Sequence, residues 1–249
     1  MVLQQQSDAN LWGKASPSSK VNVKVSWSRE RISTVTDSDG NWRLSVRTPE
    51  ASFNPQSITI SDKDGSLTLT DILIGEVWLC GGQSNMTFAM WPRPSVGQHA
   101  GRERNGYYDI MLTDAPAVRG VRMNECWSAE PKDHARLAWF AFTPGNGGNF
   151  SGAAWHYAMR LHRALKVPVG VIESAWGGSC IETWIPPAAY AASKSFKDLA
   201  TRPIRTEPNE QEKARQKKTG RGPSLHQQPR ACWNAMIHPL APYALRGAI

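Results

Sequence analysis

The sequence predicts an α/β protein whose parallel sheet follows a small all-β domain at the N-terminus. Residues 1–72 contain short alternating segments separated by turn signals, which is typical of an antiparallel β-sandwich. Further along, two nearly continuous apolar runs, residues 76–80 and 169–172, are separated by one amphipathic helical pattern. Strand, helix and strand in this order indicate a parallel sheet. We therefore expect one domain over residues 1–72 and a second over residues 73–249.

The N-terminal strands are predicted from the alternation of apolar and polar side chains. Residues 21–25 (VNVKV) and 42–46 (WRLSV) alternate along their length. Residues 57–60 (SITI) and 67–69 (LTL) flank a turn signal at residues 62–65 (DKDG). Short strands joined by regular turns bury one face against a second sheet, which predicts the sandwich.

The second domain begins with a strand expected to be buried on both faces, residues 76–80 (EVWLC). Ser151 is a candidate N-cap for a helix that runs to about Leu165, with its apolar side chains on one stripe. Residues 169–172 (VGVI) form the second buried-strand candidate. Residues 243–249 resemble the start of a third, which predicts that the domain is C-terminally incomplete in this chain.

Residues 187–230 have a different character and predict a helical cap or insertion over the α/β domain. Two helical stretches lie on either side of residues 201–203 (TRP). Much of the net charge of +8 lies in residues 213–221 (KARQKKTGR). No nucleic-acid-binding motif accompanies this basic run, so we interpret it as a solvated surface segment and expect no nucleic-acid partner.

The composition indicates an ordinary soluble globular protein of 249 residues, with 40% hydrophobic and 20% charged residues. No run of about 18 apolar residues predicts a transmembrane helix. The first residues carry neither the charged nor the apolar region of a signal peptide. The four cysteines are far apart and form no Cys-x-x-Cys pair, so no metal site is expected. Disulfides and buried free thiols both remain open.

Ser84 follows the first buried run in the stretch GGQSNM. A serine hydroxyl needs a base to take its proton and backbone N–H groups to hold the developing oxyanion. Gly81 and Gly82 permit a tight turn, and a helix starting after Ser84 would add free N–H groups and a favourable dipole. Met86 stands where the lipase pattern Gly-x-Ser-x-Gly requires glycine, which excludes that motif. On the turn pattern alone, a structural serine is the alternative.

Several blocks carry a more specific resemblance. They are residues 75–86 (GEVWLCGGQSNM), 174–184 (SAWGGSCIETW) and 233–249 (WNAMIHPLAPYALRGAI), together with the opening MVLQ and the LWG that follows it. In this order they resemble the nucleophile block, the second block, the segment before the third block and the N-terminal β-domain of the sialate O-acetylesterase family, a group of SGNH (GDSL-type) hydrolases. The resemblance implies a flavodoxin-like parallel sheet with helices on both faces.

The resemblance also implies a carbohydrate O-acetylesterase that binds an O-acetylated carbohydrate and needs no metal or organic cofactor. Ser84 would be the nucleophile and its N–H one oxyanion donor. Gly178 would offer a second N–H, with Gly177 the less favoured choice. Predicted substrate contacts are Gln83, Asn85, Trp176 and Glu182. Simple packing is the alternative for Trp176, and a solvated carboxylate is the alternative for Glu182. Export to the periplasm, the cell exterior or a lysosome is also implied.

Two parts of the family pattern are missing from this chain. The family has a third-block asparagine and a late Asp-x-x-His that supplies the base and its orienting carboxylate, and no aspartate here has a histidine three residues later. We expect the chain to stop before the third block, so that the base lies outside these residues. The alternative function is a non-catalytic glycan-binding protein with a degenerate esterase domain. The oligomeric state is left open.

Overall fold

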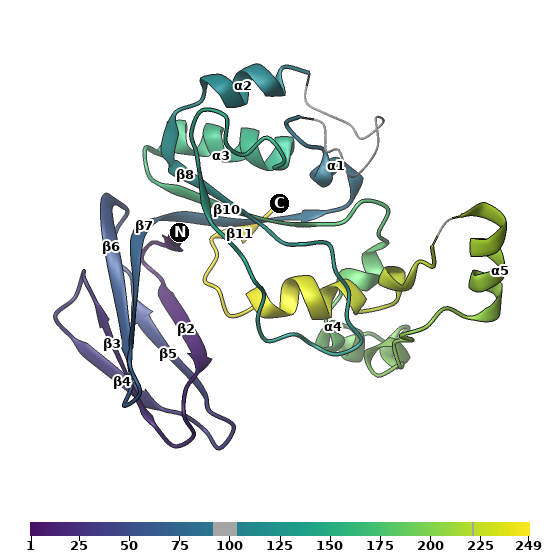
Figure 1. The fold of residues 1–249 in the computed structure, drawn as a ribbon, viewed down its shortest axis with the longest axis horizontal. Coiled ribbons are helices and arrows are strands. Elements are labelled where there is room, and N and C mark those ends of the chain that lie inside the picture. The colour runs from purple at the N-terminus through teal and green to yellow at the C-terminus, as the bar shows by residue number, and fades with distance from the viewer. Residues whose placement is uncertain (92–103, 221) are drawn as a thin grey trace.

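The computed structural model describes residues 1–91, 104–220 and 222–249. The long strand β7 (Ser66–Gly82) connects an N-terminal sheet region with the sheet of the α/β part of the molecule (Figure 1). The first half of β7 pairs antiparallel with β6 (Ser52–Ser61). Its second half pairs in parallel with β10 (Val169–Ala175) and β11 (Gly247–Ala248). One strand of 17 residues therefore serves both the N-terminal sheet and the α/β sheet.

The sequence predicted two separate strands where β7 is continuous. Asp71, a residue typical of turns, interrupts the apolar pattern and adopts a positive φ of 54°. Arg119 binds its carboxylate at 2.7 Å and its backbone carbonyl, so the chain stays in the sheet. The expected boundary between residues 72 and 73 falls inside this strand, and the division into two domains stays a prediction.

The N-terminal part is a sandwich of two sheets. The larger sheet has the order β4-β3-β6-β7 with β1 beside β7, and the smaller pairs β2 with β5. Their bounds are β1 (Val2–Gln4), β2 (Asp8–Lys14), β3 (Lys20–Val25), β4 (Arg31–Val35) and β5 (Asn41–Arg47). Val46 of the smaller sheet packs with Ile58 and Ile72 of the larger one in a shared apolar core. The predicted N-terminal β-sandwich is confirmed.

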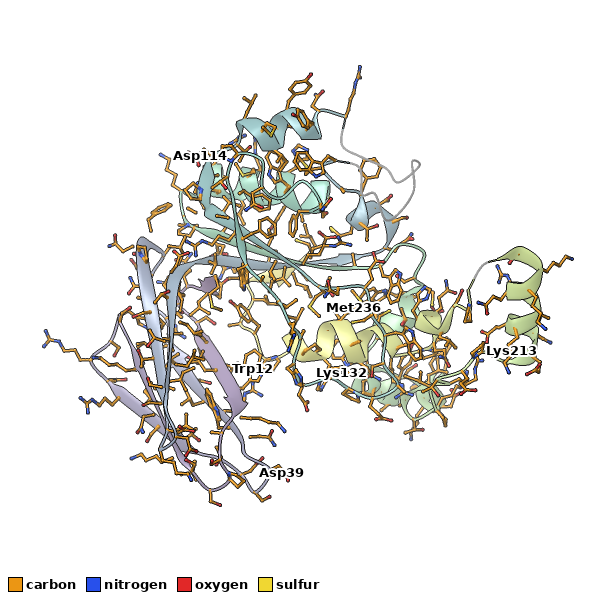
Figure 2. The ribbon with its side chains drawn as sticks, viewed as in Figure 1. Trp12, Asp39, Asp114, Lys132, Lys213 and Met236 are labelled. Atoms are coloured by element: carbon orange, nitrogen blue, oxygen red, sulfur yellow. The ribbon has the colours of Figure 1, made fainter. Side chains whose placement is uncertain are left out.

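The α/β sheet has the order β9-β8-β10-β7-β11, where β8 (Ala115–Arg122) is parallel to β10 and β9 (Phe140–Phe142) is the antiparallel edge. Helices α2 (Gly106–Leu112) and α3 (Gly152–Leu165) cover one face (Figure 1). The π-helix η5 (Trp233–Ile237) and the short η6 (His238–Leu240) cover the other. Met236, labelled in Figure 2, packs there with Val77 and Ile172. The predicted sheet with helices on both faces is confirmed.

Helix α3 forms as its sequence predicts. The hydroxyl of Ser151 accepts a hydrogen bond from the Ala154 N–H at 3.1 Å, which satisfies one of the free donors of the first turn. Lys166 ends the helix in the left-handed conformation, and its N–H donates to the carbonyl of His162. Ala154 and Ala158 are fully buried against the sheet.

Residues 187–230 contain short helices, as expected, although their role as a cap stays a prediction. They are α4 (Pro187–Ala192), η3 (Lys197–Ala200), α5 (Glu210–Thr219) and η4 (Leu225–Gln227). Helix α5 buries no residue and lies at the outer edge of the molecule, where Lys213 is labelled in Figure 2. Most of the basic run is thus on an exposed helix, and Arg221 lies outside the described residues. Within the described ranges, no helix has the length and apolar character needed to cross a bilayer.

Candidate active site

The candidate site lies where β7 and β10 end, at the carboxyl edge of the parallel sheet. Gly82 and Ala175 are directly paired in the last register position of the two strands. The Trp176 N–H then donates to the Gly82 carbonyl at 3.1 Å. This pairing joins the predicted nucleophile turn to the predicted second block. Strand β7 pairs in parallel with β10 on one side and with β11 on the other, and ligands of α/β proteins bind at the carboxyl edge of such parallel strands.

Ser84 is the first residue of the one-turn helix α1 (Ser84–Thr87), and its side chain is exposed. Its hydroxyl donates to the Gln83 side-chain oxygen at 3.1 Å. Gly82, two residues earlier, has a φ of +144°, which L side chains rarely adopt. The tight glycine turn presents the Ser84 hydroxyl to solvent.

The helix expected after Ser84 is much shorter than the sequence argument required. A helix of four residues has only a small macrodipole. The prediction of a favourable helix dipole at Ser84 is therefore wrong. The helix ends because the next residues bind elsewhere. Ala89 forms a bridge with Ser151, and the Met90 N–H donates to the Phe150 carbonyl at 3.0 Å.

Gly177 is the residue of the second block that faces Ser84 directly. A Cβ built on Gly177 would stand 3.8 Å from the Ser84 Cα and 3.4 Å from the Thr87 hydroxyl oxygen. Gly178 has a φ of +78°, and a Cβ there would meet nothing within 4 Å. Among the described residues, the backbone N–H groups of Ser84, Gly177 and Gly178 have no hydrogen-bond acceptor. All three could therefore bind an oxyanion, and the choice of Gly178 stays a prediction.

Two residues of η4 hold the second block, and sequence reasoning missed both. The His226 ring stacks on the half-buried Trp176 ring with centroids 4.3 Å apart and planes 14° apart. The Gln227 side-chain amide donates to the Gly178 carbonyl at 2.7 Å. Burial lowers the pKa of His226, and the charge of Glu125 opposes this shift. The contact spans 49 residues of sequence, and no local pattern marks it.

The remaining predicted substrate contacts lie around this turn. Gln83 and Asn85 are exposed beside Ser84. Glu182, in the 3₁₀-helix η2 (Ile181–Trp184), is exposed, while its backbone carbonyl accepts hydrogen bonds from the Tyr190 hydroxyl and the Arg230 N–H. The backbone of Glu182 thus anchors the loop. Substrate contacts by these side chains stay predictions.

A buried carboxylate lies beneath the site and was also missed. Glu173 of β10 is fully buried, with one oxygen 3.2 Å from the Arg122 side chain and the other accepting the Ser151 N–H at 2.8 Å. Burial, with a further effect of the Glu173 charge, raises the pKa of Cys80 to about 12. Glu173 thus connects the start of α3 to the sheet. In the sequence, it could have been noticed as the one charged residue of an otherwise apolar strand.

No base for Ser84 is found in the described part of the chain. No imidazole or carboxylate there accepts a hydrogen bond from its hydroxyl. His238 instead contacts the Lys132 carbonyl at 2.9 Å and lines, with Trp12 and His134, a cleft of about 930 Å³ that Ser84 does not line. Over residues 1–91, 104–220 and 222–249, no group of three His, Cys, Asp or Glu side chains could hold a metal ion.

The chain is similar to known esterases over its whole length. It is 30% identical to the sialate O-acetylesterase of Mus musculus and 27% identical to that of Rattus norvegicus, and it covers 49% of each. A carbohydrate acetylesterase from Xanthomonas citri superposes over 99% of this chain and 47% of its own, with a TM-score of 0.76 and 25% identity. The chain is a homologue of the sialate O-acetylesterases. No family model matches it.

The homology to sialate O-acetylesterases confirms the resemblance seen in the sequence blocks and the predicted fold class. The chain spans about half the length of the curated relatives it matches. An activity for the whole protein is therefore a proposal, which rests on the geometry of the candidate site around Ser84.

Proposed function

We propose that the protein containing this chain is a serine esterase that removes O-acetyl groups from carbohydrates, with Ser84 as the nucleophile. The observation that carries the proposal is the exposed Ser84 hydroxyl beside the Gly177 backbone, among N–H groups without acceptors. The names of the homologues support the reaction, since they are sialate O-acetylesterases and a carbohydrate acetylesterase.

In the proposed reaction, the Ser84 oxygen attacks the acetyl carbonyl carbon while a general base takes the hydroxyl proton. The carbonyl oxygen becomes an oxyanion, which the N–H groups of Ser84 and Gly178 bind. The bond from the carbonyl carbon to the sugar oxygen then breaks, and the sugar leaves as a hydroxyl after receiving the proton. Water then gives a proton to the general base and attacks the acetyl-serine carbonyl. The bond from the carbonyl carbon to the Ser84 oxygen breaks, acetate leaves, and Ser84 regains the proton.

The sugar is proposed to lie over the exposed side of the turn, against Gln83, Asn85 and the Trp176 ring. Amide side chains donate and accept hydrogen bonds, as hydroxyl groups do, and an indole face packs against the apolar face of a pyranose. O-acetylated sialic acid is the substrate that the homologues suggest. Export to a compartment that holds such glycans is part of the same proposal.

The test is hydrolysis of p-nitrophenyl acetate and of O-acetylated sialic acid by the complete gene product. The Ser84→Ala variant should lose activity by on the order of 10⁶-fold, as in enzymes that lose their serine nucleophile. Ser45→Ala, which removes an exposed hydroxyl from the N-terminal sandwich, is the matched control and should behave as the unchanged protein. Undiminished hydrolysis by Ser84→Ala would rule out the proposed nucleophile.

A further inference from the structure

The second block is a turn whose central peptide could point in either direction. The Ser179 N–H donates to the Trp176 carbonyl at 3.2 Å, which closes a four-residue turn with Gly177 and Gly178 at its centre. The positive φ of Gly178, without one at Gly177, is that of a type II turn. Rotating the central peptide by half a turn would give a type I turn, and two glycines oppose this rotation little.

The direction of this peptide matters because it carries the Gly178 N–H. In the proposed reaction this N–H binds the oxyanion, and donors act well only when they are held in place before the charge forms. The turn must therefore be held from outside.

The outside contacts lie on both sides of the central peptide. On one side, the Trp176 N–H is bound to the Gly82 carbonyl at 3.1 Å, and the Trp176 ring is stacked on His226. On the other side, the Gly178 carbonyl accepts from the Gln227 amide at 2.7 Å. Two of these three contacts come from adjacent residues of η4.

Helix η4 is itself fixed to the residues that follow the turn. The Thr183 hydroxyl donates to the His226 carbonyl at 2.6 Å. The Cys180 thiol donates to the Gln227 carbonyl at 3.2 Å. The η4 backbone and the second block therefore hold each other, which gives the Gln227 side chain a fixed base from which to reach Gly178.

We infer that Gln227 is a positioning residue that fixes the Gly178 N–H as an oxyanion donor. The inference rests on the proposed function, because it assigns Gln227 a role at that same site. Gln227 acts through the turn, so its effect belongs to the transition state, in which the oxyanion exists. Loss of the hydrogen bond should lower kcat and leave KM nearly unchanged.

The test compares two neighbouring glutamines in the complete gene product. Gln227→Met keeps the length of the side chain and removes the donor. Gln228→Met is the control, because Gln228 makes hydrogen bonds to Arg205 and Leu225 and none to the second block. We expect Gln227→Met to lower kcat about 3- to 10-fold, the value of one hydrogen bond, and Gln228→Met to leave kcat unchanged.

The outcomes separate this inference from the proposed function. Wild-type kcat in Gln227→Met, together with an inactive Ser84→Ala, overturns the inference alone. Equal losses in Gln227→Met and Gln228→Met assign the effect to the stability of η4 and also overturn it. An active Ser84→Ala overturns the proposed function and the inference with it. If Gln227→Met does not fold, Gln227→Glu keeps the side-chain shape, places an acceptor against the Gly178 carbonyl, and should lower kcat at least as much.

Discussion

Exchanging Gly178 for alanine should destabilise the protein without creating a clash. At the observed φ of +78°, an alanine lies in the left-handed region, which costs about 1 kcal/mol. The new methyl group meets nothing within 4 Å, so the backbone conformation is the main source of the loss. For a chain of 249 residues this corresponds to a fall in Tm of about 2–4 °C.

Exchanging Gly177 for alanine should leave the stability nearly unchanged and should lower the esterase activity. Its φ is outside the left-handed region, and the methyl group would stand at ordinary contact distance, 3.4 Å, from the Thr87 hydroxyl oxygen. We expect Tm to change by less than about 2 °C, since no strain is added. The methyl group would also stand 3.8 Å from the Ser84 Cα, in the space that the acetyl group needs. Such misplacement should lower kcat/KM by about 10²-fold.

The two variants are measured by thermal unfolding and by acetyl-ester hydrolysis. Gly222→Ala is the control, because a Cβ there also meets nothing within 4 Å and the φ is not left-handed, so neither quantity should change. Wild-type activity in Gly177→Ala would refute the claim that substrate occupies the space beside Ser84. An unchanged Tm in Gly178→Ala would refute the turn geometry.

Three further predictions concern the surroundings of the site. Burial lowers the pKa of His226 in the folded protein below its usual 6.5. The free energy of unfolding should therefore be highest above pH 6.5 and should fall as the pH drops from 6.5 through the lower pKa of the folded state, because the unfolded chain binds the proton first. Urea unfolding should show this loss, and His226→Asn should flatten it; an equal slope in the variant would contradict the assignment. Brief alkylation followed by mass spectrometry should modify the exposed Cys126 before Cys80, which is buried and whose pKa is raised to about 12; early modification of Cys80 would refute its burial. Ser151→Ala removes the α3 cap and should lower the free energy of unfolding by about 1 kcal/mol in urea titrations, whereas no change would mean that the cap contributes nothing.

Much of the fold could be predicted because its elements follow local patterns. The alternation in residues 20–25 gives β3, with Val21, Val23 and Val25 buried. The Ser151 cap marks the start of α3. Strand β8 went unpredicted because Arg119 interrupts its apolar run. The arginine can be buried there because its side chain donates hydrogen bonds to Asp71 and to the backbone carbonyls of Met1 and Pro116. The short α1 likewise depends on distant contacts of Ala89 and Met90.

The candidate residues of the site could be chosen from the sequence, and their roles stay predictions, whereas the geometry of the site could not be derived from the sequence. Ser84, Gly177 and Gly178 can be recognised from the sequence blocks that contain them. The pairing of β7 with β10 brings these blocks together in the structure. The approach of Gly177 to Ser84 and the hydrogen bond from Gln227 to Gly178 depend on how three separate segments pack. No local pattern in the sequence contains that information.

The most direct test of Ser84 as the nucleophile is labelling of the complete gene product with a fluorophosphonate, followed by mapping of the modified peptide. Ser84 is exposed beside N–H groups without acceptors, and with a general base to take its proton in the complete protein it should react as an activated serine. We predict one modified residue, Ser84, within the peptide that follows β7, and no modification in Ser84→Ala. Labelling at another serine, with Ser84 left unmodified, would contradict its role as the nucleophile.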